Sequence, residues 1–373
     1  MNVERLHAIA SAIKTDLQTT STLSHLQNLA DALHNLSSSP GNVDYQTALS
    51  VNLKALHTAL LSSATNTFSP TWKQVISETG MDVLLGMPLA ATVDNIIAKN
   101  QMTLGVAANE VKVLLSSVTE LSNVINALLS GFSTLAVGSE DLDPGECELG
   151  VLVPRGFVGN RLDYFAEELE ELNKIFGTFS ELASNSRPGF EIKTISSSDL
   201  SVYLEAAPVV GACIAVAVER IIALYKQLLE VRKLQGELRK QGLEDKSLKG
   251  IEDHANGVME QGIDTLVKEL VKEFHHGGEK GRVNELKVEL KYSLKKIANR
   301  IDRGFNIDVR MSEPATEEGE DTPAERDQTS YERIQGAAAG MQFLKLEGDP
   351  ILALEEDKPA KTRKTAAVTP PNT

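Results

Sequence analysis

An unbroken apolar seam runs along residues 104–135. Ten apolar residues recur there in alternating steps of three and four positions: Leu104, Ala107, Val111, Leu114, Val118, Leu121, Ile125, Leu128, Phe132 and Leu135. A repeat of 3.5 residues places all ten on one face of a single helix, which is about 50 Å long at 1.5 Å per residue. Because such a face is buried against another helix, we predict a mainly α-helical protein built on a helical bundle or coiled coil.

Further helices are predicted on the N-terminal side of this seam. Apolar residues indicate helices over four stretches: 6–17, 26–36, 49–60 and 81–97. Helix-breaking residues lie between them at 37–42 and at 69–70. Since short loops join helices that are antiparallel neighbours, four to six helices are expected to form an antiparallel bundle over residues 1–140.

Charge density divides the chain into three regions. Residues 1–140 contain 16 charged side chains, whereas residues 141–311 contain 53. Residues 312–373 contain 20, of which 13 are acidic. Because a change of composition often marks a domain boundary, we expect the low-charge bundle to end at residue 140 and a second domain to span 141–311.

The second region is predicted to be an α+β domain in which a small mixed β-sheet packs with long helices. Short apolar or alternating runs indicate four strands: 150–153, 190–192, 200–204 and 305–311. The last of these strands follows the helices of the region. Its return to the earlier strands would close an α+β domain.

Long helices are expected to fill the rest of this region. Asn160 is predicted to cap the first of them at its N-terminus. A second apolar seam steps by three and four residues over 214–238 and predicts one continuous helix. Two more helices are expected over 246–274 and around 286–301, so three long helices precede the final strand.

The C-terminal region is predicted to contain three segments. Residues 312–335 are rich in acids and poor in apolar residues, which is typical of a disordered linker. Residues 336–357 carry two apolar runs and are expected to dock as a hairpin or edge strand, on this chain or on a partner. Residues 358–373 are predicted to be a basic, disordered and solubilising tail.

Charge and cysteine content exclude several classes of protein. A net charge of −15 repels phosphate backbones, so nucleic acid is not expected as a partner. Two cysteines, Cys147 and Cys213, do not suffice for a disulfide framework or a cysteine zinc site. The acidic neighbours of Cys147 also disfavour a thiolate nucleophile. Because the first residues lack the pattern of a secretory signal, a cytoplasmic location is predicted.

No catalytic, cofactor-binding or metal-binding residue is nominated from the sequence. The histidines lack the spacing of metal ligands, and the glycine-rich residues 277–281 lack that of a phosphate-binding loop. Glu167, Glu170 and Glu171 indicate a solvated helix face, and residues 299–303 favour helix-end ion pairs over an anion clamp. Enzymatic activity is therefore not expected, although a site assembled from scattered residues stays open.

These features predict a non-enzymatic oligomeric scaffold or interaction protein that acts through helix–helix association. The bundle, rich in serine and threonine, has either a neutral polar surface or one covered by further subunits or an unknown protein partner. The alternative is a membrane-acting helical protein that releases two apolar segments, 83–97 and 206–218, onto lipid. Since a bilayer span needs about 20 residues, segment 206–218 is predicted to be the buried start of a helix.

Overall fold

Two compact units make up the chain, and each is discontinuous in sequence. The computed structural model describes residues 3–196, 200–241, 245–275, 277, 280–315, 323–341 and 343–354. The first unit comprises Met1–Gly156, Phe190–Glu219 and Asn306–Leu344, and the second comprises Phe157–Gly189, Arg220–Phe305 and Lys345–Thr373. The sequence places a boundary at residue 140, whereas the first unit joins the preceding helices to all four strands. The predicted fold class, mainly α with a small α+β part, is confirmed.

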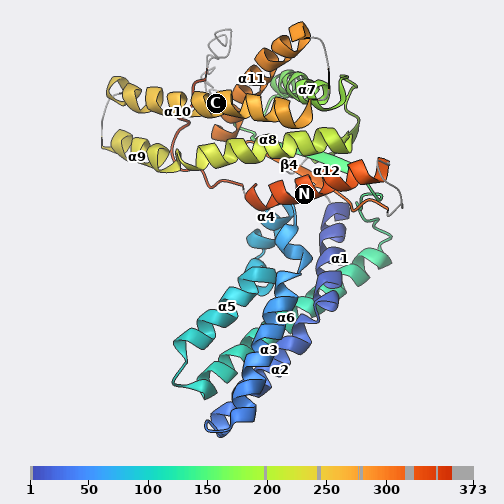
Figure 1. The fold of residues 1–373 in the computed structure, drawn as a ribbon, viewed down its shortest axis with the longest axis vertical. Coiled ribbons are helices and arrows are strands. Elements are labelled where there is room, and N and C mark those ends of the chain that lie inside the picture. Colours follow the sequence, from blue (N-terminus) through green and yellow to red (C-terminus); the bar gives the residue numbers. More distant parts are fainter. Residues whose placement is uncertain are drawn as a thin grey trace, which may run out of the picture. The chain divides into compact units, whose positions relative to one another are not determined.

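The first unit contains the helical bundle and the sheet (Figure 1). Its bundle is formed by α1 (Val3–Thr19), α2 (Thr22–Ser38), α3 (Val43–Leu61), α4 (Pro70–Glu78), α5 (Gly86–Lys99) and α6 (Leu104–Thr134), with the 3-10 helices η1 (Ala64–Thr67) and η2 (Asp82–Leu84). Its other elements are β1 (Cys147–Val153), β2 (Ile192–Ser196), β3 (Leu200–Ala206), residues 208–219 of α8 (Pro208–Lys226), β4 (Asn306–Met311) and α12 (Pro323–Gly340).

Most of the apolar seam of α6 is buried within the chain itself. Leu104 and Leu128 are only half-buried, and Leu135, predicted as the last seam residue, follows the helix and is 75% exposed. Helix α6 packs along α1 and α2, which follow one another with a break at Ser21, where φ is 48°. The ring of His7 lies 5.1 Å from that of Phe132 at one end of α6, and Gly105 lies beside Ser37 at the other. Helix α6 is therefore antiparallel to both. Helices α1 and α2 are joined by only two residues but run in the same direction, so the expectation that a short loop makes antiparallel neighbours is wrong for this pair. Seven seam residues are buried: Ala107, Val111, Leu114, Val118, Leu121, Ile125 and Phe132.

Two neighbouring residues of α6 test this packing. Ile125 is 3% exposed, whereas Val124 is 57% exposed. We expect Ile125→Ala to lower the free energy of unfolding by about 2–5 kcal/mol, because it leaves a cavity in the bundle. Val124→Ala is the matched control at a protein concentration at which the chain is a single copy, and its expected effect there is within about 0.5 kcal/mol. Urea denaturation measures both, and equal effects would contradict the burial of the seam.

The four strands form a sheet in the order β2-β3-β1-β4. Every pair in it is antiparallel, so the predicted mixed sheet is wrong in this respect. Strand β1 is central and pairs with β3 on one side and with β4 on the other. The expected return of the last strand is confirmed, because Leu149 stands opposite both Leu204 and Val309. Since β1 is flanked on both sides, Glu148 and Gly150 lie at the middle of the sheet.

The second unit is helical and corrects two predictions. It contains α7 (Leu162–Ser184), residues 220–226 of α8, α9 (Leu229–Lys240), α10 (Asp245–Phe274) and α11 (Lys280–Asp302). The seam predicted as one helix over 214–238 is interrupted between α8 and α9. Beyond the interruption, α9 buries the polar residues Arg232 and Gln235, whereas the seam residues Val231 and Leu238 are only half-buried. Asn160 does not cap α7, because it adopts a left-handed φ of 54° and Arg161 occupies the capping position.

The C-terminal region differs from the predicted linker. Helix α12 occupies Pro323–Gly340, so a disordered segment over 312–335 is wrong from Pro323 onward. The helix buries Ile334, Ala337 and Ala338, an apolar stripe that outweighs the acidic composition. Residues 316–322 of the linker, residues 342 and 355–357 of the docking segment and the basic tail lie outside the described residues.

The docking segment contacts this chain, which was one of the two predicted possibilities. Ile351, Leu352 and Leu354 are buried in the second unit. The backbone N–H of Leu352 donates to Oδ2 of Asp302 at 2.8 Å, and the Asn299 amide bonds the backbone of Leu354. Over residues 343–354 this segment forms no strand. Residues 336–340 of the predicted docking segment belong to α12 instead. The part that docks does so through hydrogen bonds to α9, α10 and α11 rather than as a hairpin or edge strand.

Candidate functional site

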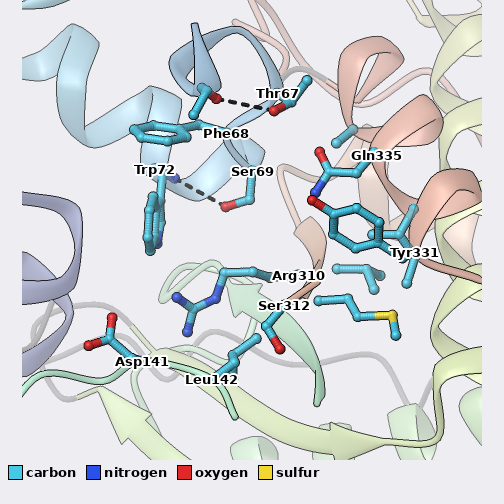
Figure 2. Close-up of a pocket in the computed structure, with 15 residues that line it drawn as sticks. Thr67, Phe68, Ser69, Trp72, Asp141, Leu142, Arg310, Ser312, Tyr331 and Gln335 are labelled. Carbon is cyan, nitrogen blue, oxygen red and sulfur yellow. Dashed lines mark hydrogen bonds between the residues drawn. The ribbon is translucent and has the colours of Figure 1, made fainter. Parts of the chain in front are cut away.

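A pocket of about 300 Å³ opens in the first unit (Figure 2). Its walls come from four separate segments: η1 with the start of α4, the loop before β1, the end of β4, and α12. Its polar or charged lining residues are Thr67, Ser69, Trp72, Asp141, Arg310, Ser312, Tyr331 and Gln335, and its apolar ones are Ala64, Phe68, Leu142, Val309, Met311, Ile334 and Ala338. This mixture of apolar and polar side chains is typical of small-molecule sites.

Asp16 fixes the wall that contains η1. The buried carboxylate accepts hydrogen bonds from Oγ of Ser63 at 2.8 Å and from the backbone N–H of Ala64 at 2.7 Å. Burial raises the pKa of Asp16, while these two hydrogen bonds oppose that rise. Because Ser63 and Ala64 begin η1, the carboxylate of α1 holds the pocket wall in place.

Ser69 and Phe68 orient the aromatic part of the same wall. Ser69 caps α4, and its hydroxyl accepts from the backbone N–H of Trp72 at 3.5 Å. The Phe68 and Trp72 rings meet edge to face, with centroids 5.0 Å apart. Trp72 is 9% exposed, so its indole is a fixed part of the pocket.

Arg310 of β4 lies beside this indole. Its guanidinium carbon is 5.1 Å from the centroid of the Trp72 ring, within cation–π range. Its Nη2 donates to the backbone oxygen of Glu140 at 3.2 Å and to Oε1 of Glu148 at 3.4 Å. In Figure 2, Trp72 and Arg310 lie on one side of the pocket, while Tyr331 and Gln335 lie on the other.

A buried ion-pair cluster behind the pocket anchors Arg310. The two Nη atoms of Arg5 donate to both carboxylate oxygens of Glu148, at 3.0 and 2.9 Å, and its Nε donates to Glu140 at 2.9 Å. The Arg5 guanidinium also lies over the Tyr203 ring, 3.5 Å from its centroid. Burial is the largest influence and lowers the pKa of Arg5, but Glu148, Tyr203 and Glu140 together outweigh it and leave the pKa of Arg5 raised. The cluster thus joins α1 to β1 and holds Arg310 at the pocket.

Helix α12 closes the opposite wall with one face. Tyr331, Ile334, Gln335 and Ala338 recur at steps of three, one and three residues and all line the pocket. That spacing places them on one side of the helix. The Tyr331 hydroxyl points into the pocket in Figure 2.

Several polar atoms around the pocket are buried without a hydrogen-bond partner among the described residues. Three of them belong to residues that line the pocket: Nε1 of Trp72, Nε of Arg310 and Oε1 of Gln335. The fourth is Oδ1 of Asp308, which lies two residues before Arg310 on β4. Burial also raises the pKa of Asp308. Buried polar atoms of folded proteins are nearly always paired, so three such atoms on pocket-lining residues mark this pocket as the candidate functional site.

The two cysteines lie in the core of the first unit. Cys147 and Cys213 are both buried and are not joined in a disulfide. Burial, followed by the nearby Glu148 carboxylate, raises the pKa of the Cys147 thiol well above its usual range. This agrees with the prediction that Cys147 is a poor nucleophile, although burial contributes more than the acidic neighbours do.

The charged residues noted in the sequence form structural ion pairs in the second unit. Arg300 binds the buried carboxylate of Glu168 on α7, at 2.6 and 3.1 Å, and Asp302 binds Arg232 at 2.9 Å. The preference for ion pairs over an anion clamp is therefore supported, but the partners lie on other helices. The acidic face of α7 is only partly solvated, since Glu171 pairs with Lys296.

The pocket was not anticipated from the sequence, because its residues come from stretches more than two hundred positions apart along the chain. Among the described residues, no group of three or more histidine, cysteine or acidic side chains is arranged to hold a metal ion. No family model, no curated protein and no solved structure matches this chain.

Proposed function

We propose that this chain is a non-enzymatic, cytoplasmic interaction protein that self-associates through coiled-coil-like packing of its bundle helices. The α6 seam does not supply the contact, since α1 and α2 of the same chain cover it. The proposed contact between copies is instead the outer surface of the bundle. The proposal rests on the exposed apolar side chains that gather there.

The exposed apolar side chains are unevenly distributed. Of 17 large apolar side chains that are exposed among the described residues, 11 lie between Val3 and Leu135. Helix α3 buries only Leu56 and Leu60 out of its 19 residues. Because residues 1–140 also carry only 16 charged side chains, this surface has little charge to keep copies of the chain apart.

Three valines on α6 supply the clearest contact surface. Val106, Val113 and Val124 are 47%, 67% and 57% exposed. Steps of seven and eleven residues bring them close to one line along the helix, at 100° per residue. These valines form an interrupted apolar line on α6, apart from the buried seam, because Ser117 lies on the same line and the exposed Glu110 and Glu120 flank it. We propose that this line contacts a helix of another copy.

Sedimentation velocity on the full chain and on paired variants tests this proposal. We expect Val113→Glu with Val124→Glu to weaken self-association at least about tenfold, since each replaces an apolar contact by a carboxylate and adds to the negative charge of Glu110 and Glu120 on this face. The matched control is Leu234→Glu with Val288→Glu, two exposed positions of the second unit. The control should associate like the wild type. Equal behaviour of the two double variants would contradict the role of the α6 line.

A membrane-acting protein is the second candidate. Within the described part of the chain, two helices, α6 and α8, are long and apolar enough to cross a membrane by length and composition alone. Only 22% of the apolar window of α6 is buried, against 61% for α8. The predicted segment 206–218 overlaps α8, whereas segment 83–97 falls on η2 and the 14-residue α5, below the about 20 residues of a bilayer span. The exposed surface of α6 is the observation that favours this candidate.

A further inference from the structure

We propose that the pocket between β4, α4 and α12 binds a neutral, planar carboxamide, the class that includes aromatic amides and lactams. This goes beyond self-association, because the pocket lies apart from the α6 valine line. The site is built from fixed elements. The Asp16 hydrogen bonds hold η1, the Ser69 cap holds α4, and the Glu140 and Glu148 contacts hold Arg310.

The unpaired polar atoms define the hydrogen bonds that a ligand must make. Nε1 of Trp72 and Nε of Arg310 are N–H donors, so they require an acceptor such as a carbonyl oxygen. Across the pocket, the Gln335 amide offers an acceptor without a partner, which suits an N–H donor of the ligand. A carboxamide carries both groups in one plane, with the carbonyl and the N–H on adjacent atoms.

Charge around the pocket favours a neutral ligand over an anion. The positive charges of Arg5 and Arg310 are already matched by the carboxylates of Glu140 and Glu148. Asp141 adds a further acidic group to the lining. A carboxylate ligand would therefore introduce an uncompensated charge into a partly buried site, which is unfavourable.

The apolar walls fit a flat ring. Phe68, Trp72 and Tyr331 supply aromatic surface from two sides, and Ile334 and Met311 supply aliphatic surface. A volume of about 300 Å³ lies at the lower end of the range for small-molecule pockets. This size suits a small ring compound rather than a folded polypeptide.

Trp72 makes the pocket directly observable, because it is the single tryptophan of the chain. The test is titration of the full chain with benzamide, benzoate and toluene, followed by tryptophan fluorescence and by ligand-observed saturation-transfer NMR. Benzamide should bind saturably, and benzoate and toluene at least about tenfold more weakly. Toluene forms no hydrogen bonds, and benzoate lacks the N–H donor and carries a negative charge.

Two variants localise the binding. Gln335→Leu should weaken benzamide binding about tenfold, because it removes the partner of the ligand N–H. The matched control Gln328→Leu makes the same change on α12, at a half-buried residue outside the pocket lining, and should bind like the wild type. Ala338→Leu fills the pocket without touching a polar group and should also abolish binding.

Three results would overturn the proposal. They are an absence of saturable benzamide binding by both methods, binding of benzoate or toluene as tight as that of benzamide, and equal affinity of Gln335→Leu and Gln328→Leu. Circular dichroism and the thermal midpoint of each variant show whether it is folded. If Gln335→Leu does not fold, Ala338→Leu provides an independent test.

Discussion

Replacing Arg5 by methionine should lower the free energy of unfolding of the first unit by about 3–5 kcal/mol. Arg5 and Glu148 are each 2% exposed, and the substitution leaves the Glu148 carboxylate buried with only the longer contact to Arg310 at 3.4 Å. It also removes the hydrogen bond to Glu140 and the contact with the Tyr203 ring. Urea denaturation, followed by the fluorescence of Trp72, measures the loss.

Two controls separate the buried ion pair from a general effect of the substitution. Lys14→Met changes a half-buried cation of α1 for which the described residues provide no ion-pair partner, and its expected effect is within about 0.5 kcal/mol. Arg5→Met combined with Glu148→Leu removes both charges and should recover much of the loss. If the double variant were less stable than Arg5→Met, the buried carboxylate would not be the cause.

Asp302→Ala should have an effect of similar size in the second unit, about 3–5 kcal/mol. Asp302 is fully buried and accepts hydrogen bonds from Arg232 at 2.9 Å, from the Tyr225 hydroxyl and from the backbone N–H of Leu352. Without it, the Arg232 guanidinium stays buried, and the described residues offer no other carboxylate that pairs with it. The segment 343–354 also loses an anchor and should exchange its amide hydrogens faster.

Hydrogen exchange resolved by mass spectrometry measures both consequences of this change. Asp264→Ala is the matched control, since Asp264 is 49% exposed and forms an ion pair with Lys291 on the surface. Such exposed pairs contribute about 0–1 kcal/mol, so segment 343–354 should keep its protection there. Unchanged exchange of segment 343–354 in Asp302→Ala would show that Asp302 does not hold it.

The helices and strands were largely predictable, because their signals are local. The spacing of Leu104 to Leu135 identifies α6, and the alternation near Phe305 and Met311 identifies β4. What covers the α6 seam was not predictable, since an apolar seam fits a helix of the same chain as well as one of another chain. The exposed valines beside it become visible only once the partner helices are known.

Features that depend on residues far apart along the chain were not predicted from the sequence. The break between α8 and α9 accompanies the burial of Arg232, whose partner Asp302 lies seventy positions further along the chain. Helix α12 was not predicted, because the acidic residues at and before its start are typical of a disordered linker. Its apolar stripe, formed by Ile334 and the alanines that follow, was overlooked. The pocket was not predicted either, because four separate segments each contribute only a few of its lining residues.

The central claim of this account is that copies of the chain associate through the outer surface of the bundle. The mass of the full chain in solution, measured by sedimentation velocity over a range of protein concentrations, tests it most directly. The account predicts a concentration-dependent shift from one copy to a defined multiple. A single copy at every concentration would contradict it, and flotation of that monomer with lipid vesicles would favour the membrane-acting alternative.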